Sequence, residues 1–172
     1  MDTWEGPIDT GDVPGDGSSF DVIVVGGGPS GSAAASYNAL NGCKVLLIEK
    51  GVWPRDKVCG DAVGGKSLSH VKELGVKEMV EATPHFMVDS IVLGSANGST
   101  VKVMLPQDEF EKKMAGYSLP RMQFDYMMFK RATEIVTSAG GSVIQGFNVK
   151  GVLEEGGQIT GTSGSCLVYT PD

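Results

Sequence analysis

The sequence predicts an α/β fold that opens with a β-α-β unit, and three observations lead to this prediction. FDVIVV at residues 20–25 is a short, β-branched apolar run that ends in glycines, as a buried parallel strand does. A helix is expected from Pro29 to Asn41, with Pro in its first turn and Gly42 at the left-handed position after its end. KVLLIE at residues 44–49 is a second apolar strand, so the crossover between the strands is expected to be right-handed.

Further helices and strands are expected after this unit. An Ala-Asn-Gly turn separates two apolar runs and indicates a hairpin, and paired glycines end a long helical pattern. The patterns predict a long loop at 51–65, helices at 67–74, 77–81 and 123–138, a hairpin of 90–93 with 100–105, and strands at 142–153, 158–161 and 166–169.

Composition and charge are those of an ordinary globular domain, with 41% hydrophobic and 20% charged residues in a chain of 172. Five of the 21 acidic residues lie in residues 1–19, which contain no Lys or Arg and are rich in Gly, Pro and Ser. We therefore predict a disordered acidic leader at 1–19 and one folded domain at 20–172. The rest of the chain is nearly balanced in charge, which excludes the basic footprint of a nucleic-acid-binding protein.

Signals for export or membrane insertion are absent from the sequence. The leader lacks the positive start and apolar stretch of a secretory signal, and no run of about 18 apolar residues could span a bilayer. The three cysteines, Cys43, Cys59 and Cys166, are an odd number without C-x-x-C spacing, which argues against a disulfide framework or a zinc site. These features favour a reducing, cytoplasmic setting.

The junction between the first strand and the first helix carries a G-x-G-x-x-G motif, Gly26-Gly27-Gly28-Pro29-Ser30-Gly31. The first glycine permits a tight turn, the second lets the backbone approach a pyrophosphate, and the third lets the helix pack closely on the strand. The N–H groups and partial positive charge of the helix N-terminus then face the phosphates. The motif therefore predicts a Rossmann-like dinucleotide site rather than a turn without a ligand.

Glu49 ends the second strand about 20 residues after the motif. A carboxylate at this position can accept hydrogen bonds from the 2′-hydroxyl of a ribose, and it would repel a 2′-phosphate. We therefore expect the ADP part of FAD, or NAD, at this site and disfavour NADP.

A second stretch, Pro54-Arg55-Asp56-Lys57-Val58-Cys59-Gly60-Asp61, follows the acid. Together with the glycine motif it resembles the geranylgeranyl reductase family of flavoproteins, which share the para-hydroxybenzoate hydroxylase type of FAD-binding fold. Arg121-Met122-Gln123-Phe124-Asp125 is similar to the R-x-x-F-D that opens a helix in the same family. The resemblance extends from residue 20 to about residue 169 and is weak between 67 and 116.

The resemblance implies an FAD-dependent oxidoreductase that reduces isoprenoid double bonds of a prenyl lipid with a hydride from reduced FAD. It implies a Rossmann-like FAD-binding domain with an inserted β-hairpin region and partial substrate-domain strands at about 85–120, truncated before the substrate domain is complete. The implied partners are the lipid, an electron donor (a ferredoxin-like protein or NAD(P)H), a peripheral membrane contact and a complementary C-terminal chain.

The motif and the resemblance together assign a set of residues to cofactor binding. Arg55 and Arg121 are implied to contact the cofactor, residues 59–61 to lie near the isoalloxazine ring, and the strand containing Val149 to hold adenine through its backbone. The full set is Gly26, Gly28, Pro29, Ser30, Gly31, Glu49, Lys50, Arg55, Cys59, Gly60, Asp61, Arg121 and Val149. No catalytic residue and no metal ligand can be named.

Other readings stay open at this point. Arg55 and Lys57 could be solvated loop charges, Arg121 could pair with Asp125 on its own helix, and Cys59 could be a small loop residue. An FAD-dependent monooxygenase or halogenase of the same fold would share the glycine motif. A non-catalytic dinucleotide-binding fragment that needs a partner chain is a third reading.

Overall fold

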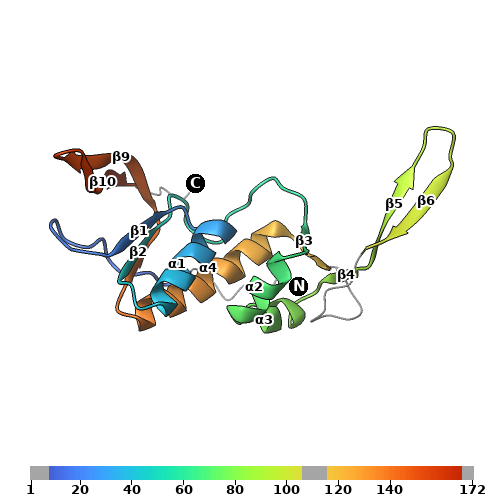
Figure 1. Ribbon diagram of the computed structural model, residues 1–172, viewed down its shortest axis with the longest axis horizontal. Coiled ribbons are helices and arrows are strands. Elements are labelled where there is room, and N and C mark those ends of the chain that lie inside the picture. Colours follow the sequence, from blue (N-terminus) through green and yellow to red (C-terminus); the bar gives the residue numbers. More distant parts are fainter. Residues whose placement is uncertain (1–7, 106–115, 168–172) are drawn as a thin grey trace. The chain divides into compact units, whose positions relative to one another are not determined.

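The computed structural model describes residues 8–105 and 116–167. Residue contacts divide the chain into two compact units, Met1–Asp56 with Asp125–Asp172, and Lys57–Phe124. Figure 1 shows the elements in chain order.

The first unit is built on a parallel sheet with strand order β1-β2-β8. β1 (Val22–Val25) pairs in register with β2 (Val45–Ile48), and β2 pairs with β8 (Ser142–Ile144). Helix α1 (Pro29–Leu40) connects β1 to β2, and Gly42 follows it with a φ of +86°. The predicted β-α-β unit is confirmed, because its strands and its helix fall within the expected segments.

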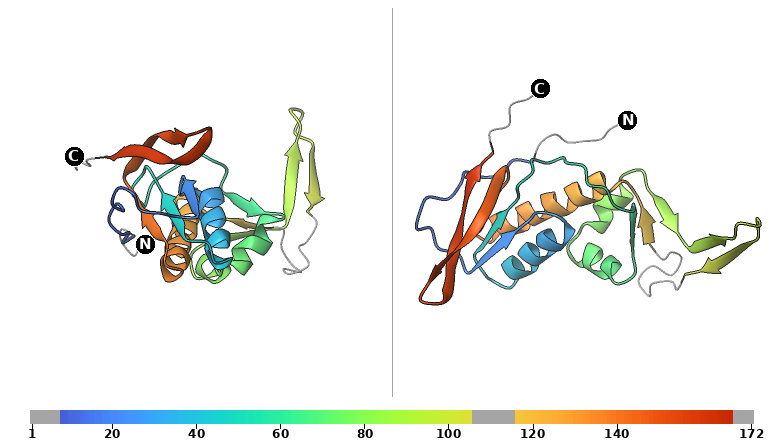
Figure 2. Two further views of the ribbon diagram at one scale, coloured as in Figure 1. Left: turned by 60° about the vertical axis from the view of Figure 1, so that its left-hand side comes forward. Right: turned by 90° about the horizontal axis from the view of Figure 1, so that it is seen from above.

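Three layers make up the first unit, as the left view of Figure 2 shows. Helices α1 and α4 (Arg121–Ser138) lie on one side of the sheet, and the hairpin of β9 (Phe147–Glu155) and β10 (Gln158–Cys166) lies on the other. Alternate strand residues face the two sides, as the pleat requires. Leu46, Ile48 and Ile144 form the buried cluster toward the hairpin, where Phe147 and Val149 pack against it.

The single strand expected over 142–153 is a wrong prediction. The chain breaks at Gln145 and Gly146, and Gly146 has a φ of +71°, a conformation that glycine adopts without strain. β8 therefore ends in the parallel sheet, and β9 starts an antiparallel hairpin in another layer. The separate strands expected at 158–161 and 166–169 are one continuous strand, β10, as far as Cys166; residues 168 and 169 lie outside the described residues.

The second unit combines two short helices with a three-stranded antiparallel sheet of order β3-β7-β4. The helices are α2 (Ser67–Glu73) and α3 (Lys77–Glu81), and the strands are β3 (Ala62–Gly64), β4 (Phe86–Val88) and β7 (Gly116–Ser118). β3 lies inside the region expected to be a loop. The buried residues of the second unit include Leu68, Val71, Leu74, Val80 and Tyr117.

A separate hairpin completes the second unit, where β5 (Ser90–Gly94) pairs only with β6 (Thr100–Met104) among the described residues. This confirms the hairpin prediction. Every residue of β6 and four of the five residues of β5 are exposed. The assignment of residues 85–120 to a substrate domain stays a prediction.

The described end of the leader, residues 8–19, contains neither helix nor strand. Ile8 is nevertheless buried, and its carbonyl oxygen accepts a hydrogen bond of 2.7 Å from Gln145 Nε2. Residues 13–20 line one side of a hollow of about 710 Å³ whose floor is the hairpin-facing side of the parallel sheet.

Candidate nucleotide-binding site

The loop from β1 to α1 has the backbone geometry that the glycine motif predicts. Gly26 has a φ of +107°, in a region of backbone conformation that residues other than glycine rarely adopt. A Cβ placed on Gly31 would overlap the carbonyl oxygen of Gly26, so only glycine lets the helix begin this close to the strand. A Cβ on Gly27 would lie 2.5 Å from a ring carbon of Phe129. Gly26 is therefore required by its backbone conformation, and Gly27 and Gly31 are required by packing.

Gly28 differs from these glycines, because a Cβ there would meet only the Arg55 Nη2 atom, at 4.0 Å. Gly28 is the N-cap of α1 with an extended conformation, which any residue can adopt. Its lack of a side chain is therefore not explained by packing within the described residues. It leaves space between the loop backbone and the Arg55 guanidinium, where a pyrophosphate can approach.

The N-terminus of α1 is open to an anion. Pro29 occupies the first turn, which holds no acidic residue, and no side chain among the described residues caps this end. The Ser32 hydroxyl, which could have capped it, instead donates to the Gly27 carbonyl oxygen at 3.0 Å. The exposed Ser30 and the half-buried Gly31 bring backbone N–H groups to this end, where the helix dipole favours negative charge.

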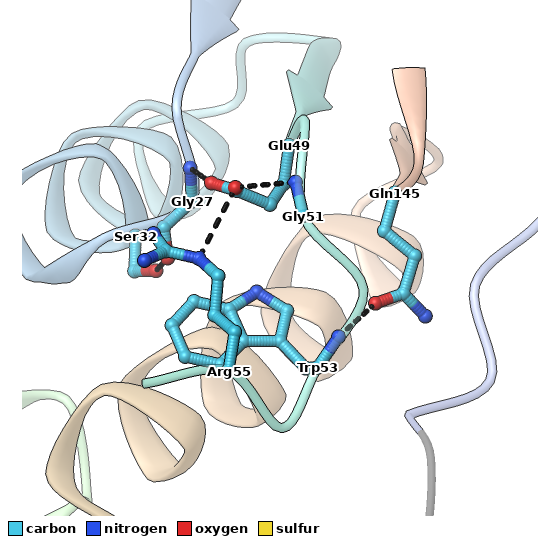
Figure 3. Close-up of polar contacts among 7 residues, drawn as sticks. All are labelled: Gly27, Ser32, Glu49, Gly51, Trp53, Arg55 and Gln145. Carbon is cyan, nitrogen blue, oxygen red and sulfur yellow. Dashed lines mark hydrogen bonds and ion pairs between the residues drawn. The ribbon is translucent and has the colours of Figure 1, made fainter. Parts of the chain in front are cut away.

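Glu49 braces the loop from the end of β2 (Figure 3). Its carboxylate is buried and accepts hydrogen bonds from the Gly27 N–H at 2.5 Å and the Gly51 N–H at 2.7 Å. Arg55 Nε lies 3.2 Å from Glu49 Oε1 in an ion pair, without the alignment of a hydrogen bond. Each carboxylate oxygen keeps acceptor capacity beyond these contacts, so the group can still accept from a ribose hydroxyl.

Arg55 is held in place rather than solvated. Besides its ion pair with Glu49, its guanidinium carbon lies 4.4 Å from the centroid of the Trp53 ring (Figure 3). The Arg55 side chain is 26% exposed. Of the two readings of Arg55 left open by the sequence, the solvated loop charge is therefore wrong.

The other predicted residues of the first unit lie at different distances from this arrangement. Lys50 follows Glu49 and is exposed. Val149 pairs with Gly164 across the β9–β10 hairpin and packs half-buried against the sheet cluster. Neither residue has a described contact with the glycine loop.

Cys59, Gly60, Asp61 and Arg121 belong to the second unit. All but Arg121 are exposed, and the Asp61 carboxylate accepts a hydrogen bond of 3.1 Å from the Arg121 N–H. Asp61 therefore fixes the start of α4 to the loop after Cys59. The place of residues 59–61 near the isoalloxazine ring and the contact of Arg121 with the cofactor stay predictions.

Sequence reasoning missed Trp53, Phe129 and Gln145. Trp53 is 1% exposed and stacks on Phe129 with a centroid distance of 5.4 Å. Its backbone N–H donates to Gln145 Oε1 at 2.9 Å. The visible signal was a tryptophan directly before the Pro-Arg stretch, a large aromatic residue in a segment expected to be a long loop.

Taken together, these residues fit the ADP part of a dinucleotide. The open helix end and the space at Gly28 suit a pyrophosphate, the guanidinium of Arg55 suits phosphate oxygens, and the carboxylate of Glu49 suits a ribose hydroxyl. The described residues contain no cluster of three or more His, Cys, Asp or Glu side chains that could hold a metal. Nor do they include a helix of the length and apolarity needed to cross a bilayer.

Comparison with known proteins gives a matching family model. The model of FAD dependent oxidoreductases matches residues 21–163. The digeranylgeranylglycerophospholipid reductase of Methanocella arvoryzae is 35% identical over 155 residues, which cover 86% of this chain and 35% of that protein. The menaquinone reductase of Mycobacterium tuberculosis is 34% identical over 116 residues, 67% of this chain and 27% of that protein.

Solved structures show the same similarity. The myxobacterial chondrochloren halogenase superposes with a TM-score of 0.71 at 26% identity, over 83% of this chain and 32% of the halogenase. A geranylgeranyl bacteriochlorophyll reductase-like protein from Thermoplasma acidophilum superposes with a TM-score of 0.60 at 26% identity, over 86% and 35%. The chain thus spans about a third of the length of these similar proteins.

Proposed function

Because this chain belongs to the FAD-dependent oxidoreductases, whose cofactor is FAD, we propose that it forms the ADP-binding part of a reductase acting on isoprenoid double bonds. Within this proposal, Gly28 and the N-terminus of α1 bind the pyrophosphate, Glu49 binds the adenosine ribose, and Arg55 neutralises phosphate charge. Lys50 and Val149, and separately residues 59–61 and Arg121, are also proposed as cofactor-binding residues.

One observation carries the cofactor assignment. A buried carboxylate at the end of β2 holds both the glycine loop and the loop of Arg55, so one acid fixes the two segments that would contact a dinucleotide. A merely structural turn would not need Gly28, whose Cβ position is nearly free of neighbours.

The substrate class rests on similarity to the digeranylgeranylglycerophospholipid reductase of Methanocella arvoryzae, over 86% of this chain. When bound, reduced FAD supplies a hydride, which with a proton saturates a carbon–carbon double bond. The chain's own residues orient the cofactor. An electron donor, either a ferredoxin-like protein or NAD(P)H, and a peripheral membrane contact through the lipid in a cytoplasmic setting belong to the same proposal.

The cofactor proposal is tested first on the purified chain. We expect a flavin absorption spectrum, and FAD as the nucleotide released after denaturation. A colourless chain that rebinds neither FAD nor ADP would contradict the proposed site. For the substrate, the complete protein is incubated without oxygen with a geranylgeranyl lipid and a reductant, and saturation is followed by mass spectrometry. If the lipid is not saturated in the presence of bound, reduced FAD, the proposed substrate class is wrong.

The superposition with the halogenase supports a second candidate, an FAD-dependent halogenase or monooxygenase. Oxygen consumption coupled to a hydroxylated or halogenated product would favour it over the reductase.

A further inference from the structure

We propose that Trp53 is a positioning residue for nucleotide binding, which holds the Arg55 guanidinium beside the glycine loop through a cation–π contact. This inference rests on the proposed function, because it assumes that Arg55 contacts the phosphates of FAD. The inference adds to the site a residue that acts through its aromatic ring and not through a polar contact of its own.

A stack of two aromatic rings packs against the Arg55 guanidinium. Phe129 of α4 touches the glycine loop, since a Cβ on Gly27 would lie 2.5 Å from its ring, and Trp53 stacks on Phe129 with a centroid distance of 5.4 Å and an interplanar angle of 28°. Arg55 Cζ then lies 4.4 Å from the Trp53 ring centroid. The two stacked rings therefore connect the Arg55 guanidinium to the glycine loop.

The backbone of this segment is also fixed by the residues that follow β8, an edge strand of the parallel sheet. The Trp53 N–H donates to Gln145 Oε1 at 2.9 Å, and the Gly146 N–H donates to the Gly51 carbonyl oxygen at 3.2 Å. Gln145 and Gly146 directly follow β8. The indole therefore sits on a segment tied at two points to the end of the parallel sheet, and it is a rigid base for a flexible arginine.

The choice of tryptophan is not explained by the stability of the fold. Trp53 is 1% exposed, yet its indole Nε1 has no hydrogen-bond partner among the described residues. A buried N–H without a partner is destabilising, and phenylalanine would avoid that cost. Tryptophan has the strongest attraction for a cation over its face, and Arg55 occupies that face.

The orientation of Arg55 makes this contact useful. Its Nε faces Glu49, its plane rests near Trp53, and its Nη2 lies toward the open position at Gly28. Two contacts thus use the inner part of the guanidinium and leave an outer nitrogen for an anion. A guanidinium held in this way loses less side-chain entropy when it binds a phosphate.

A mutant cycle on the 172-residue chain tests the inference. The dissociation constants of FAD and ADP are measured for wild type, W53L, W53F, R55M and the W53L/R55M double variant, and the unfolding midpoint of each is recorded. W53L removes the ring, and W53F keeps an aromatic face. W53M, with a flexible side chain that fills irregular space, replaces W53L in the cycle if W53L does not fold.

We expect R55M to weaken binding about 10- to 100-fold, the range of a charge-assisted hydrogen bond. W53L should weaken it about 5- to 30-fold, the range of a desolvated cation–π contact, and W53F should recover most of that loss. In the R55M background, W53L should change the dissociation constant less than about twofold, because there is no guanidinium left to position.

Equal losses from W53L in both backgrounds would overturn the inference, because a purely structural role does not depend on Arg55. So would wild-type affinity in W53L while R55M is impaired. A wild-type chain that binds neither FAD nor ADP is a different result, because it contradicts the proposed function itself and the inference with it.

Discussion

Exchanging Glu49 for glutamine should destabilise the chain far more than the loss of one surface charge does. E49Q preserves the shape of a buried side chain, but it replaces one of two acceptor oxygens with an NH2 group. In the structure both oxygens are in use, since Oε2 accepts from the Gly27 N–H and Oε1 accepts from the Gly51 N–H. The amide therefore turns its NH2 toward one backbone N–H, which loses its partner.

The expected magnitude follows from these contacts. One unpaired buried N–H costs about 1–3 kcal/mol. Loss of the ion pair with Arg55, whose side chain is partly exposed, adds at most about 1 kcal/mol. The free energy of unfolding should thus fall by roughly 1–4 kcal/mol, which for a chain of this size lowers the unfolding midpoint by roughly 2–15 °C.

Thermal unfolding without nucleotide, followed by circular dichroism, measures this effect. The matched control is E134Q on α4, where Glu134 pairs with Arg131 at 2.9 Å and both side chains are more than a third exposed. We expect its effect to stay below about 0.5 kcal/mol. An E49Q midpoint equal to that of wild type, or lowered no more than that of E134Q, would refute the bracing role of Glu49.

Three further predictions concern the glycines and the ribose site. G28A should leave the unfolding midpoint unchanged, since its Cβ meets no atom closer than 4.0 Å, but weaken FAD binding at least about tenfold by blocking the pyrophosphate; equal affinity in titrations would contradict this. G31A should instead destabilise the fold by about 1–3 kcal/mol, because helix and strand must move apart, and a wild-type denaturant midpoint would contradict it. ADP should bind more tightly than its 2′-phosphorylated form, because Glu49 is negatively charged; calorimetry that finds no preference would show that Arg55 offsets that charge.

The parts of the fold that were predictable from sequence depend on local patterns. β1, α1 and β2 follow from apolar runs, a helix-starting proline and a C-terminal glycine within about 30 residues, so few long-range contacts enter. The break at Gln145–Gly146 was not predictable in the same way. Both sides of it are β-rich, and only the layer that each strand joins separates β8 from β9.

The residues of the candidate site also differ in whether local sequence patterns predict them. Gly26, Gly31 and Glu49 could be assigned from spacing, because each acts within one β-α-β unit. Trp53 could not, since its importance comes from Phe129, 76 positions further along the chain, and from the arginine above it. Besides its predicted role at the ribose, Glu49 holds two backbone segments. This second role was visible only from the hydrogen bonds that its two oxygens accept from Gly27 and Gly51.

The hairpin of β5 and β6 has a consequence for amide hydrogen exchange. Ile91, Val92, Leu93, Val101 and Val103 are all at least 44% exposed, and the two strands are bonded only to each other among the described residues. An isolated two-stranded hairpin is marginally stable in water, so its amides should exchange by local opening long before those of the parallel sheet. Slow exchange in this segment would then show directly that the hairpin has become covered.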